Sequence, residues 1–600
     1  MRKGHVLKTN KKAEIPSHCI FFDTETDEVA ISDTEKQLVL KMGSACYVRR
    51  FKGYTWSKPT WKRFTKAEAF WKFVSDHCKD KVKLFLFAHN FMFDFTVTEG
   101  FIHLEKLGFK LEKAIIDDPP VIIHFRRGEQ TLCCLDTFNY FKSSVEELGK
   151  GIGLTKLTMP DPGASSEAWD EYNTRDTDIL RKAMLDFFGF ITDNDLGNFQ
   201  PTIASQAFTA YRHRFMQHRI LIHDDEDALI LERASYHGGR TECFYLGHAQ
   251  GPFYQLDVNS QYPYMMKTCE YPRWHVWNQD NPSLAEVRQL LGGYCLTADC
   301  DLHLNEPAIA TVANNKLVFP IGDFPAVIST PEIEYCLDNN AIKNTRRVCV
   351  YEKAPIFTEY VNTLYALRQE YASKANDSFK LMAKYMLNTL YGKFGQSGYV
   401  YDTIEKTTDD EVKTWEVWNV EDQKLIKYRQ FGGLIQAMKR EGESYNSFPA
   451  IAAHVTAYAR MYLLQLISVA GYDNVYYVDT DSLVVNHAGY TKLRDYIHPT
   501  VLGMLKLERT IKQLTIHGPK DYVFDDTVKI KGIRKNAIQI KPSTYSQDRF
   551  RKFKGMLQSG NLNALVVTRT TKTLARTYNK GVRTDNGRVI PLRFLPIHPS

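Results

Sequence analysis

A chain of 600 residues exceeds the size of one compact domain, so we expect roughly two to four domains. Hydrophobic residues make up 44% of it and charged residues 24%, which is typical of a packed protein and excludes a disordered one. No apolar run reaches about 18 residues, and the basic N-terminal segment lacks an apolar core, so the sequence predicts neither a membrane span nor a secretory signal. The eleven cysteines include no Cys-x-x-Cys pair, which indicates reduced, mostly buried thiols in a cytoplasmic compartment.

Basic residues are unevenly distributed along the chain. The whole sequence has 77 Lys+Arg and 70 Asp+Glu, a net charge of +7. Residues 501–600 hold 20 Lys+Arg against 6 Asp+Glu, so the first 500 residues carry a net charge of −7. This asymmetry favours a polyanion held by the C-terminal hundred residues near metal-binding carboxylates in the body. A solvated basic surface without a partner is the alternative.

The first acidic cluster follows a predicted buried strand, residues 19–22. Side chains alternate along a strand, so Asp23 and Glu25 lie on one side of its end, roughly 6.6 Å apart along the strand. The next apolar strand, residues 84–88, leads through His89 and Asn90 to Asp94. These positions put carboxylates at the ends of separate elements.

A helix is predicted to open at Tyr172 and to run through Phe187, with Tyr172 and Asp176 one turn apart on one face. Four acids could then hold two metal ions for in-line attack of water on a phosphodiester: Asp23, Glu25, Asp94 and Asp176. Any one of these acids alone is more often a helix cap or a surface charge, so the inference depends on the set.

Two features follow in the middle of the chain. In Tyr236-His237-Gly238-Gly239, paired glycines after an aromatic residue allow close approach of the backbone to another chain, although an ordinary Gly-Gly turn is the alternative. Residues 253–256 then form a predicted strand that delivers Asp257.

A predicted helix carries Lys380, Lys384, Asn388 and Tyr391 at i, i+4, i+8 and i+11, a stripe about 80° wide on one face. Two lysines one turn apart repel each other unless an anion lies across them, and a triphosphate supplies that anion. A solvent-facing lysine pair is the alternative, but it leaves Asn388 and Tyr391 without a role.

The stretch from Tyr476 to Val485 predicts a strand, a tight turn and a second strand, with Asp479 and Asp481 at the tip. Neighbouring carboxylates are costly unless a cation lies between them, and Mg²⁺ takes carboxylate and phosphate oxygens. Asp257 and Asp481 together could bridge two metal ions, with the Val258 carbonyl oxygen as a further ligand. An isolated Asp-Thr-Asp surface turn is the alternative.

The N-terminal set resembles the Exo I, II and III motifs of proofreading 3′–5′ exonucleases: Asp23-x-Glu25, Asn90-x-x-Phe93-Asp94 and Tyr172-x-x-x-Asp176. The resemblance implies that the four acids are metal ligands and that Tyr172 orients the attacking water. It also implies contacts with the single-stranded primer end from Thr26, His89, Asn90 and Phe93. Asp136-Thr137-Phe138 resembles a further single-strand-binding motif, and Lys156 matches a catalytic lysine of some relatives.

The later set resembles motifs A, B and C of family B DNA polymerases: Asp257-x-x-Ser260-Gln-Tyr262-Pro263, Lys384-x-x-x-Asn388-Thr389-x-Tyr391-Gly392 and Tyr477-x-Asp479-Thr480-Asp481-Ser482. Gln261 replaces the commoner Leu, and Thr389 the commoner Ser. The resemblance implies catalytic roles for Asp257, Asp479 and Asp481, two Mg²⁺ (or Mn²⁺) ions per active site, and a Tyr262 ring that excludes a 2′-hydroxyl. It implies that Lys380, Lys384, Asn388 and Tyr391 bind the deoxynucleoside triphosphate.

Contacts with template and primer DNA are likewise implied by this resemblance, which includes a Tyr-x-Gly-Gly motif and a Lys-x-Tyr motif. The residues concerned are Tyr236, Gly238, Gly239, Ser260, Gly392, Thr480, Lys520, Tyr522 and Lys531. A basic thumb gripping duplex phosphates is expected after the Lys-x-Tyr motif.

Two long blocks separate motif A from motif B and motif B from motif C, which resembles the protein-primed polymerases of bacteriophages, viruses and linear plasmids. That resemblance implies a terminal protein as priming partner, strand displacement, and a single-stranded DNA-binding protein as a further partner. A conventional primer-using family B polymerase is the alternative. A nuclease with a DNA-binding C-terminal half is a second alternative, which would not need Asp257, Lys384 and Asp481.

The expected fold is α/β and multidomain: a ribonuclease H-like exonuclease followed by a right-hand polymerase with inserts. The expected boundaries are an exonuclease domain (1–190), a linker with the Tyr-x-Gly-Gly motif and the first part of the palm (191–263), palm with an insert resembling a terminal-protein region (264–360), fingers (361–398), a second insert (399–447), palm with motif C and the Lys-x-Tyr motif (448–525) and a basic thumb (526–600).

Overall fold

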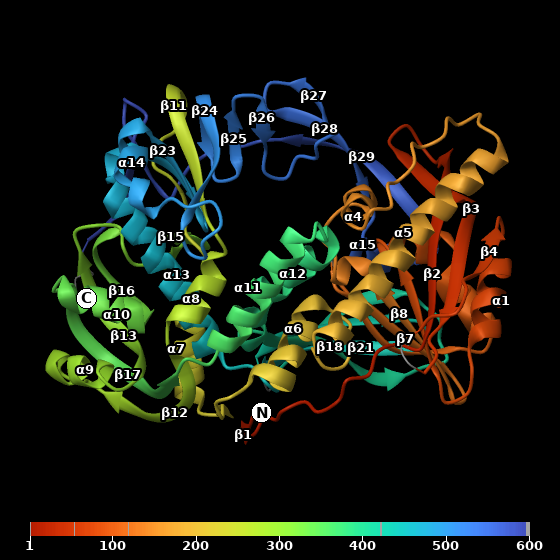
Figure 1. The fold of residues 1–600 in the computed structure, drawn as a ribbon, viewed down its shortest axis with the longest axis horizontal. Coiled ribbons are helices and arrows are strands. Elements are labelled where there is room, and N and C mark those ends of the chain that lie inside the picture. The colour runs from red at the N-terminus through yellow and green to blue at the C-terminus, as the bar shows by residue number, and fades with distance from the viewer. Residues whose placement is uncertain (1, 53–54, 118, 421–422, 596–600) are drawn as a thin grey trace.

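The computed structural model describes residues 2–52, 55–117, 119–420 and 423–595. Residues 1, 53, 54 and 118 of the expected exonuclease domain, residues 421 and 422 of the second insert and residues 596–600 of the expected thumb therefore lie outside the described residues. Figure 1 shows two lobes, the N-terminal one at the right and the other at the left, with helices between them. No helix in the described ranges has the length and apolar character that crossing a membrane requires.

The N-terminal lobe is built on a ten-stranded sheet. Its strand order is β27-β28-β29-β3-β2-β5-β8-β7-β6, with β4 paired to β3. The strands are β2 (His18–Ala30), β3 (Glu35–Arg49), β4 (Thr60–Phe64), β5 (Lys83–Ala88), β6 (Lys110–Ile116), β7 (Val121–Arg127), β8 (Gln130–Asp136), β27 (Ile538–Lys541), β28 (Thr544–Phe550) and β29 (Leu565–Thr573). The helices are α1 (Ala67–His77), α2 (Phe91–Val97), α3 (Gly100–Lys106), α4 (Val145–Gly151) and α5 (Ser166–Asp193).

Local sequence explains the two elements that matter most in this lobe. The apolar residues Cys19 to Phe22 are fully buried, because β2 is covered on both faces. Helix α5 begins at Ser166, six residues before the predicted start at Tyr172, because the Ser165 side chain accepts a hydrogen bond from the Ala168 amide and caps the helix.

The palm sheet has the strand order β10-β22-β23-β11-β24-β25-β26. Its strands are β10 (Thr241–Cys243), β11 (Gly247–Val258), β22 (Val475–Asp479), β23 (Ser482–Asn486), β24 (Leu505–Gly518), β25 (Asp521–Phe524) and β26 (Thr527–Lys529). Around it lie α7 (Glu226–Ser235), α8 (Gln261–Thr268), the almost wholly buried α13 (Pro449–Ala470) and α14 (His487–Lys492). The predicted strand–turn–strand around Asp479 and Asp481 is confirmed as β22–β23.

The block between motifs A and B supplies the middle strands of a third sheet, of order β1-β9-β12-β17-β13-β16-β32. It contains β1 (His5–Val6), β9 (Leu221–Ile222), β12 (Tyr271–Asp280), β13 (Cys295–Leu304), β16 (Ile321–Ser329), β17 (Ile342–Ala354) and β32 (Arg593–Phe594), with α9 (Leu284–Leu291), α10 (Thr330–Asp338) and a hairpin of β14 (Thr311–Ala313) and β15 (Lys316–Val318). The two ends of the described chain thus lie at opposite edges of this sheet.

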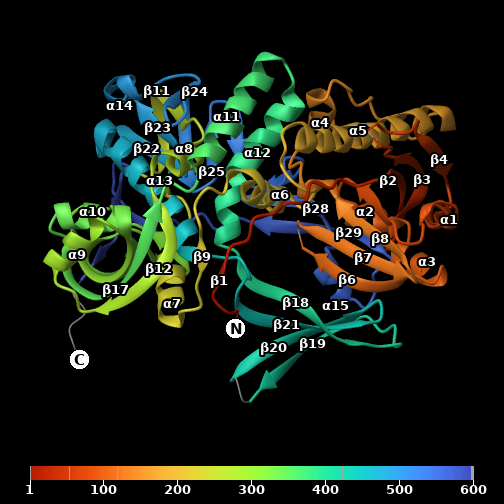
Figure 2. The same ribbon diagram turned by 60° about the horizontal axis from the view of Figure 1, so that its bottom comes forward.

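The helices between the lobes are α6 (Ile203–Ala210), α11 (Thr358–Ser373) and α12 (Asp377–Phe394). Helix α12 is capped by the Asn376 side chain and buries Met382, Met386 and Leu390, so its polar stripe faces away from the core. The second insert is a four-stranded sheet of β18 (Ser397–Lys406), β21 (Leu434–Glu443), β20 (Lys424–Phe431) and β19 (Lys413–Asn419), which projects below the N-terminal lobe in Figure 2.

Segments far apart in the sequence complete the core of the N-terminal lobe. Phe431 of the second insert is fully buried and contacts Phe101, with ring centroids 6.1 Å apart. It also contacts Phe553 of α15 (Phe553–Gln558), at 5.2 Å. Strand β29 adds to the sheet by pairing with β3, Leu565 opposite Leu38. Burial of these apolar side chains holds the second insert and the C-terminal segment against the lobe.

Residues 526–600, the expected thumb, contribute strands to several sheets. Strand β26 extends the palm sheet, β27 to β29 extend the sheet of the N-terminal lobe, and β32 joins the third sheet. Between them, β30 (Gly581–Arg583) and β31 (Val589–Pro591) form a hairpin. In Figure 1, β25 to β29 cross the top of the molecule from one lobe to the other.

Candidate active sites

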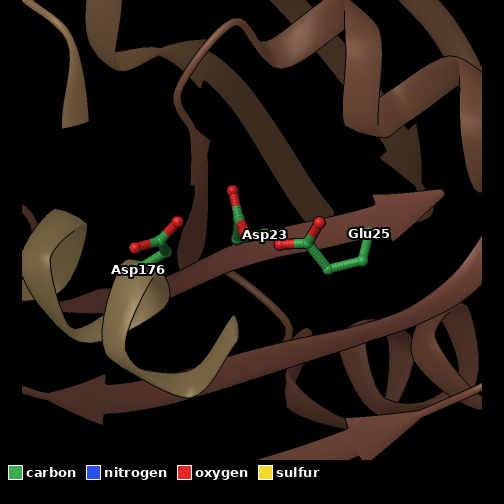
Figure 3. A group of neighbouring side chains, drawn as sticks. All are labelled: Asp23, Glu25 and Asp176. Carbon is green, nitrogen blue, oxygen red and sulfur yellow. The ribbon is translucent and has the colours of Figure 1, made fainter. Parts of the chain in front are cut away.

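The first site lies where β2 meets α5. Ligand oxygens of Asp23, Glu25 and Asp176 all lie within 4.8 Å of one another, and Figure 3 shows the three side chains around one space. Helix α5 approaches the sheet closely because small polar residues meet there, Ser44 and Thr177 having hydroxyl oxygens 2.6 Å apart. The prediction that the strand and the helix bring these acids together is confirmed.

The carboxylates of this group are held close together with little solvent. Burial, and then the charges of Asp94, Asp176 and Glu25, raise the pKa of Asp23 well above its ordinary value. Burial and the Asp176 charge raise the pKa of Glu25 to about 7. In addition, Asp176 Oδ1 is buried without a hydrogen-bond partner. Clustered hard oxygen donors with an unsatisfied member fit a divalent cation such as Mg²⁺.

Asp94, the fourth predicted ligand, lies next to this group without belonging to it. Its Oδ1 accepts hydrogen bonds from the Thr24 amide, at 2.9 Å, and from the Thr24 hydroxyl, at 2.7 Å. Burial raises the pKa of Asp94 to about 8, although both hydrogen bonds from Thr24 lower it. Asp94 therefore lies beside Asp23, and one of its carboxylate oxygens is bound by Thr24 of β2.

Lys156 and Tyr172 lie on the other side of the group. Lys156 forms an ion pair with Asp176, and its ammonium lies 4.5 Å from the centre of the Tyr172 ring. Burial lowers the pKa of Lys156, but the hydrogen bonds and charges of Asp176 and Tyr172 together outweigh burial and raise the pKa overall. The lysine therefore stays charged beside the carboxylates.

Asn173 belongs to this site and was missed by the sequence analysis. Its side chain is fully buried, and Nδ2 donates a hydrogen bond of 2.8 Å to Asp23 Oδ2. The available signal was its position on α5, three residues before Asp176 and therefore on the same face.

The expected single-strand contacts surround the end of β5. His89 Nδ1 lies 2.8 Å from the Thr137 hydroxyl, and the His89 ring lies 3.9 Å from that of Phe138. Thr137 is fully buried, so its hydroxyl is a fixed partner for the His89 ring. Asp136 accepts hydrogen bonds from the amides of Asn90 and Phe91 and so shapes the turn.

Three other predicted contacts lie at the rim of the site. Asn90 is exposed and adopts a left-handed backbone conformation, with φ of 67°. Phe93 is partly exposed and contacts Phe550 of β28, with ring centroids 6.0 Å apart. Thr26, also partly exposed, follows Glu25 on β2.

The second site is formed by neighbouring strands of the palm sheet. Asp257 at the end of β11 is paired with Ser482 of β23, and the Val258 amide donates to the Asp481 carbonyl oxygen at 2.8 Å. Residues more than two hundred positions apart are thus adjacent in the sheet. Thr480 lies in the turn of the hairpin and has a left-handed backbone conformation, with φ of 66°. Its amide donates a hydrogen bond to the Arg240 carbonyl oxygen.

The charge of a lysine on α12 acts on Asp257 and Asp481. Burial, and then Asp481 and Glu508, raise the pKa of Asp257 to about 7. Burial also raises the pKa of Asp481. The ammonium of Lys384, on α12, opposes the increase at both carboxyls. Lys384 of the predicted stripe on α12 therefore lies near the acids, and the two partly buried carboxylates again fit a hard divalent cation.

Tyr262 stacks on Tyr391, with ring centroids 5.0 Å apart, and so joins α8 to α12. Gly239 lies against this pair, because a Cβ atom there would come within 2.8 Å of Thr480 Cγ2 and 3.0 Å of the Tyr262 hydroxyl. Tyr236 lies against Gly395, just beyond the end of α12. The close backbone approach expected of the paired glycines is thus observed at Gly239, whereas Gly238 is exposed.

Other predicted residues lie along α12 and beside it. Lys384, Asn388 and Gly392 are exposed on the helix, and Lys380 donates to Asp377 at 2.8 Å. Arg368 of α11 was missed by the sequence analysis. Its guanidinium donates to the Ser260 hydroxyl at 2.6 Å, which places a further cation beside α8.

A cavity of about 340 Å³ opens beside the hairpin. Asp479, Thr480, Asp481, Lys520 and Tyr522 are among its lining residues. Asp479 accepts a hydrogen bond from Thr241 at 3.0 Å and lies 3.6 Å from Lys520 Nζ, so it has partners of its own. Lys531, farther along the chain, lines a neighbouring cavity.

The fold is that of a bacteriophage DNA polymerase. The structure of the phi29 DNA polymerase with primer-template DNA and incoming nucleotide substrates superposes with a TM-score of 0.68, at 16% identity, over 93% of this chain and 100% of that chain. The phi29 enzyme complexed with single-stranded DNA superposes with a TM-score of 0.66, also at 16% identity and with the same shares of both chains. The expected α/β architecture of an exonuclease followed by a right-hand polymerase is thereby confirmed.

Residues 165–468 match the family described as DNA polymerase type B, organellar and viral, and the chain belongs to that family. Similar proteins include a "Probable DNA polymerase" of Ascobolus immersus, 26% identical over 322 residues, which are 51% of this chain and 26% of the relative. A second, from Podospora anserina, is 26% identical over 387 residues, 56% of this chain and 31% of the relative. The DNA polymerase of Bacillus phage phi29 is 22% identical over 321 residues, 49% of this chain and 48% of the relative. The chain thus spans about a quarter to a third of the two fungal relatives.

The raised pKa of Asp257 predicts how stability depends on pH in the absence of divalent ions. A carboxyl whose pKa is higher in the folded state, about 7, than in the unfolded state, about 4, stabilises the fold at low pH. This contribution is lost as the pH rises through that window. We therefore expect the free energy of unfolding, measured by denaturant titration in EDTA, to fall less between pH 5 and pH 8 in Asp257→Asn than in the unsubstituted protein. The exposed Asp526→Asn serves as control, and equal losses in all three proteins would contradict the expectation.

Proposed function

We propose that this protein is a template-directed DNA polymerase with a 3′–5′ proofreading exonuclease, each activity having its own divalent-metal site. The observation that carries the proposal is the adjacency of Asp257 and Asp481 opposite Lys384. Membership of the type B family and the phi29 fold support it. The separate group of Asp23, Glu25 and Asp176 supports a second, hydrolytic site.

At the polymerase site, Asp257 and Asp481 would hold the ions, with the Val258 carbonyl oxygen as a further ligand. When bound, divalent ions lower the pKa of the attacking hydroxyl and neutralise charge on the phosphates. Lys384 and Lys380 would bind the triphosphate, with Asn388 beside them. Lys520 and Tyr522 would steady the primer end, near Asp479.

At the exonuclease site, Asp23, Glu25 and Asp176 would hold the ions, with Asp94 beside them. Tyr172 would orient the attacking water, and Lys156 would keep Asp176 charged. The rim residues Thr26, His89, Asn90 and Phe93 would receive the single-stranded primer end, and Phe138 would support His89. Tyr236, Ser260 and Gly392 would contact DNA on the polymerase side.

Separation of the two activities tests this proposal. We expect Asp481→Ala to reduce deoxynucleotide incorporation to background and to leave primer degradation intact, because Asp481 lies in the turn between β22 and β23 of the palm and not in β2 or α5. The paired change Asp23→Ala with Glu25→Ala should do the reverse. Extension of a labelled primer-template measures incorporation, and shortening of the same labelled primer without nucleotides measures the exonuclease activity. Loss of both activities in either variant, with the thermal transition unchanged, would refute the two-site assignment.

The position of the Tyr262 ring leads to a second prediction, on discrimination against ribonucleotides. A ring stacked on Tyr391 would lie beneath the incoming sugar and exclude a 2′-hydroxyl. Tyr262→Val should therefore reduce discrimination against ribonucleotides by about tenfold or more, since steric exclusion in a pocket is typically of that size. The ratio of the kcat/KM values for a deoxynucleotide and the matching ribonucleotide measures this discrimination, and Tyr385→Val, on the helix that carries Tyr391, serves as control. Unchanged discrimination would remove Tyr262 from this role.

We further propose protein-primed replication of a linear viral or plasmid genome with strand displacement. The two inserted blocks and the phi29-type fold support it. A terminal protein would then be the priming partner, with a single-stranded DNA-binding protein as a second partner. The eleven free cysteines, ten of them buried, support work in a reducing host cytoplasm. A conventional nucleic-acid-primed enzyme is the alternative.

Priming can be tested without any nucleic-acid primer. We expect incubation with Mg²⁺, labelled dATP and a candidate terminal protein to transfer label to that protein, because its hydroxyl would replace the primer 3′-hydroxyl. Asp481→Ala, as control, should transfer none. Extension of DNA primers without any label on protein, across the terminal-protein candidates of the same genome, would favour the conventional alternative.

A further inference from the structure

The turn that carries Asp481 is held in place by a neighbouring segment of backbone. Thr480, in the same turn between β22 and β23, has a left-handed conformation, which is strained for a β-branched residue and persists only where the surrounding structure enforces it. The Thr480 amide donates a hydrogen bond of 2.7 Å to the Arg240 carbonyl oxygen. A Cβ atom at Gly239 would come within 3.2 Å of Thr480 Cα, so residues 239 and 240 both lie against the turn. The position of Asp481 therefore depends on the position of this backbone.

Strand β10, which follows directly, is too short to fix this backbone by pairing alone. It has three residues and lies at the edge of the palm sheet, where β22 is its neighbour. Thr241 of β10 is paired with Asp479, and its hydroxyl donates to the Asp479 carboxylate at 3.0 Å. A short edge strand makes few ladder hydrogen bonds. Its position therefore depends on the side-chain contacts of the residues beside it, and Arg240 makes the largest of these.

The Arg240 side chain is fully buried and held on several sides. Its Nε donates a hydrogen bond of 2.6 Å to Glu242, also buried, on β10. The guanidinium lies 4.2 Å from the centre of the Phe319 ring and 5.6 Å from that of Phe244. A planar guanidinium that is bonded to a carboxylate and stacked on aromatic rings has little freedom to move. Arg240 therefore holds its own backbone, and with it the Thr480 amide, in one place.

Packing alone does not account for an arginine at this position. Both Nη atoms of Arg240 are buried without a hydrogen-bond partner among the described residues. A buried charge that is only partly satisfied lowers stability, and replacing a buried ion pair by apolar side chains of similar volume is often neutral or stabilising. Residues that break such a rule are expected at functional sites.

We propose that Arg240 is a positioning residue of the polymerase site, which fixes the turn that carries Asp481 through its own backbone carbonyl. Phe319, which holds its guanidinium, lies between β15 and β16 in the block between motifs A and B. That block then supports nucleotide incorporation on a DNA primer, in addition to any part that it has in priming. The inference rests on the proposed function only in taking Asp481 to be a ligand of the catalytic ions.

The first test is the full-length variant Arg240→Lys, which keeps the charge and loses the planar group that stacks on the rings. We expect kcat for incorporation on a primer-template to fall by about 10- to 100-fold, as when a partner that orients a metal ligand is removed. KM for the deoxynucleotide should stay within about twofold, because the lysines of α12 are unchanged. The Mg²⁺ concentration for half-maximal incorporation should rise, whereas that for primer degradation should not, because the exonuclease acids lie in the other lobe.

The second test, Phe319→Ala, leaves Arg240 in place and removes the ring that holds it. We expect the same changes in kcat and in Mg²⁺ dependence, with a decrease in kcat of about tenfold. The matched control is Phe324→Ala, on β16 of the same block, where a buried ring contacts Phe594 at a centroid distance of 5.9 Å. Both changes remove a buried phenyl ring and should lower the thermal transition alike, but Phe324→Ala should leave kcat and Mg²⁺ dependence unchanged.

Unchanged kcat and Mg²⁺ dependence in Phe319→Ala would overturn the proposal, and so would an equal decrease in Phe324→Ala, which would reduce the contact to general packing. If Arg240→Lys does not fold, these two alanine variants decide the question by themselves. Failure of the proposed function would look different, because the unsubstituted protein would then incorporate no nucleotide on any primer-template.

Discussion

The structure depends on carboxylates of like charge held close together in little solvent. Asp257 ends β11 and Asp481 precedes β23, two strands that pair only in the folded chain, and the pKa of each is raised chiefly by burial. The N-terminal group repeats the same arrangement between β2 and α5. Such clusters oppose folding unless a counter-charge compensates them, and two kinds of counter-charge fit this chain. Lysines 156 and 384 stand beside the acids, and hard oxygen donors are arranged for divalent cations.

The rest of the fold keeps these two groups in fixed relation to each other. The core of the N-terminal lobe is completed by Phe431 and Phe553, which belong to the second insert and the C-terminal segment. Helix α12 contacts both α5 and α13, so a helix that faces the palm acids also borders the lobe that carries the other site. The second insert and the C-terminal segment therefore help to join the two sites in one packed body.

The local features of both sites could be predicted because they depend on short-range rules. Alternation along β2 places Asp23 and Glu25 together, helical periodicity places Tyr172 near Asp176, and the hairpin at Asp479 follows from its flanking apolar residues. What escaped prediction was the part that Asn173 and Arg368 take in the two sites. In the sequence, Asn173 is an ordinary polar residue of a helix, and only the fold brings Asp23 within hydrogen-bonding distance. Arg368 belongs to no motif, and its role depends on its contact with Ser260 in the folded chain. The start of α5 was misplaced because the capping serine, Ser165, seven residues before Tyr172, was overlooked.

By itself, the sequence determined which residue types stand at strand ends and on helix faces, and with them the family resemblance, because these patterns are set by neighbours within a few positions. Only the tertiary structure decided that residues 257 and 481 share one sheet edge and that the Arg240 side chain packs against Phe319 of the block between motifs A and B. The same holds for β29, which lies against β3 although more than five hundred residues separate them. Strand pairing and burial join segments whose separation along the chain carries no local signal, so these juxtapositions exist only once the whole chain has folded.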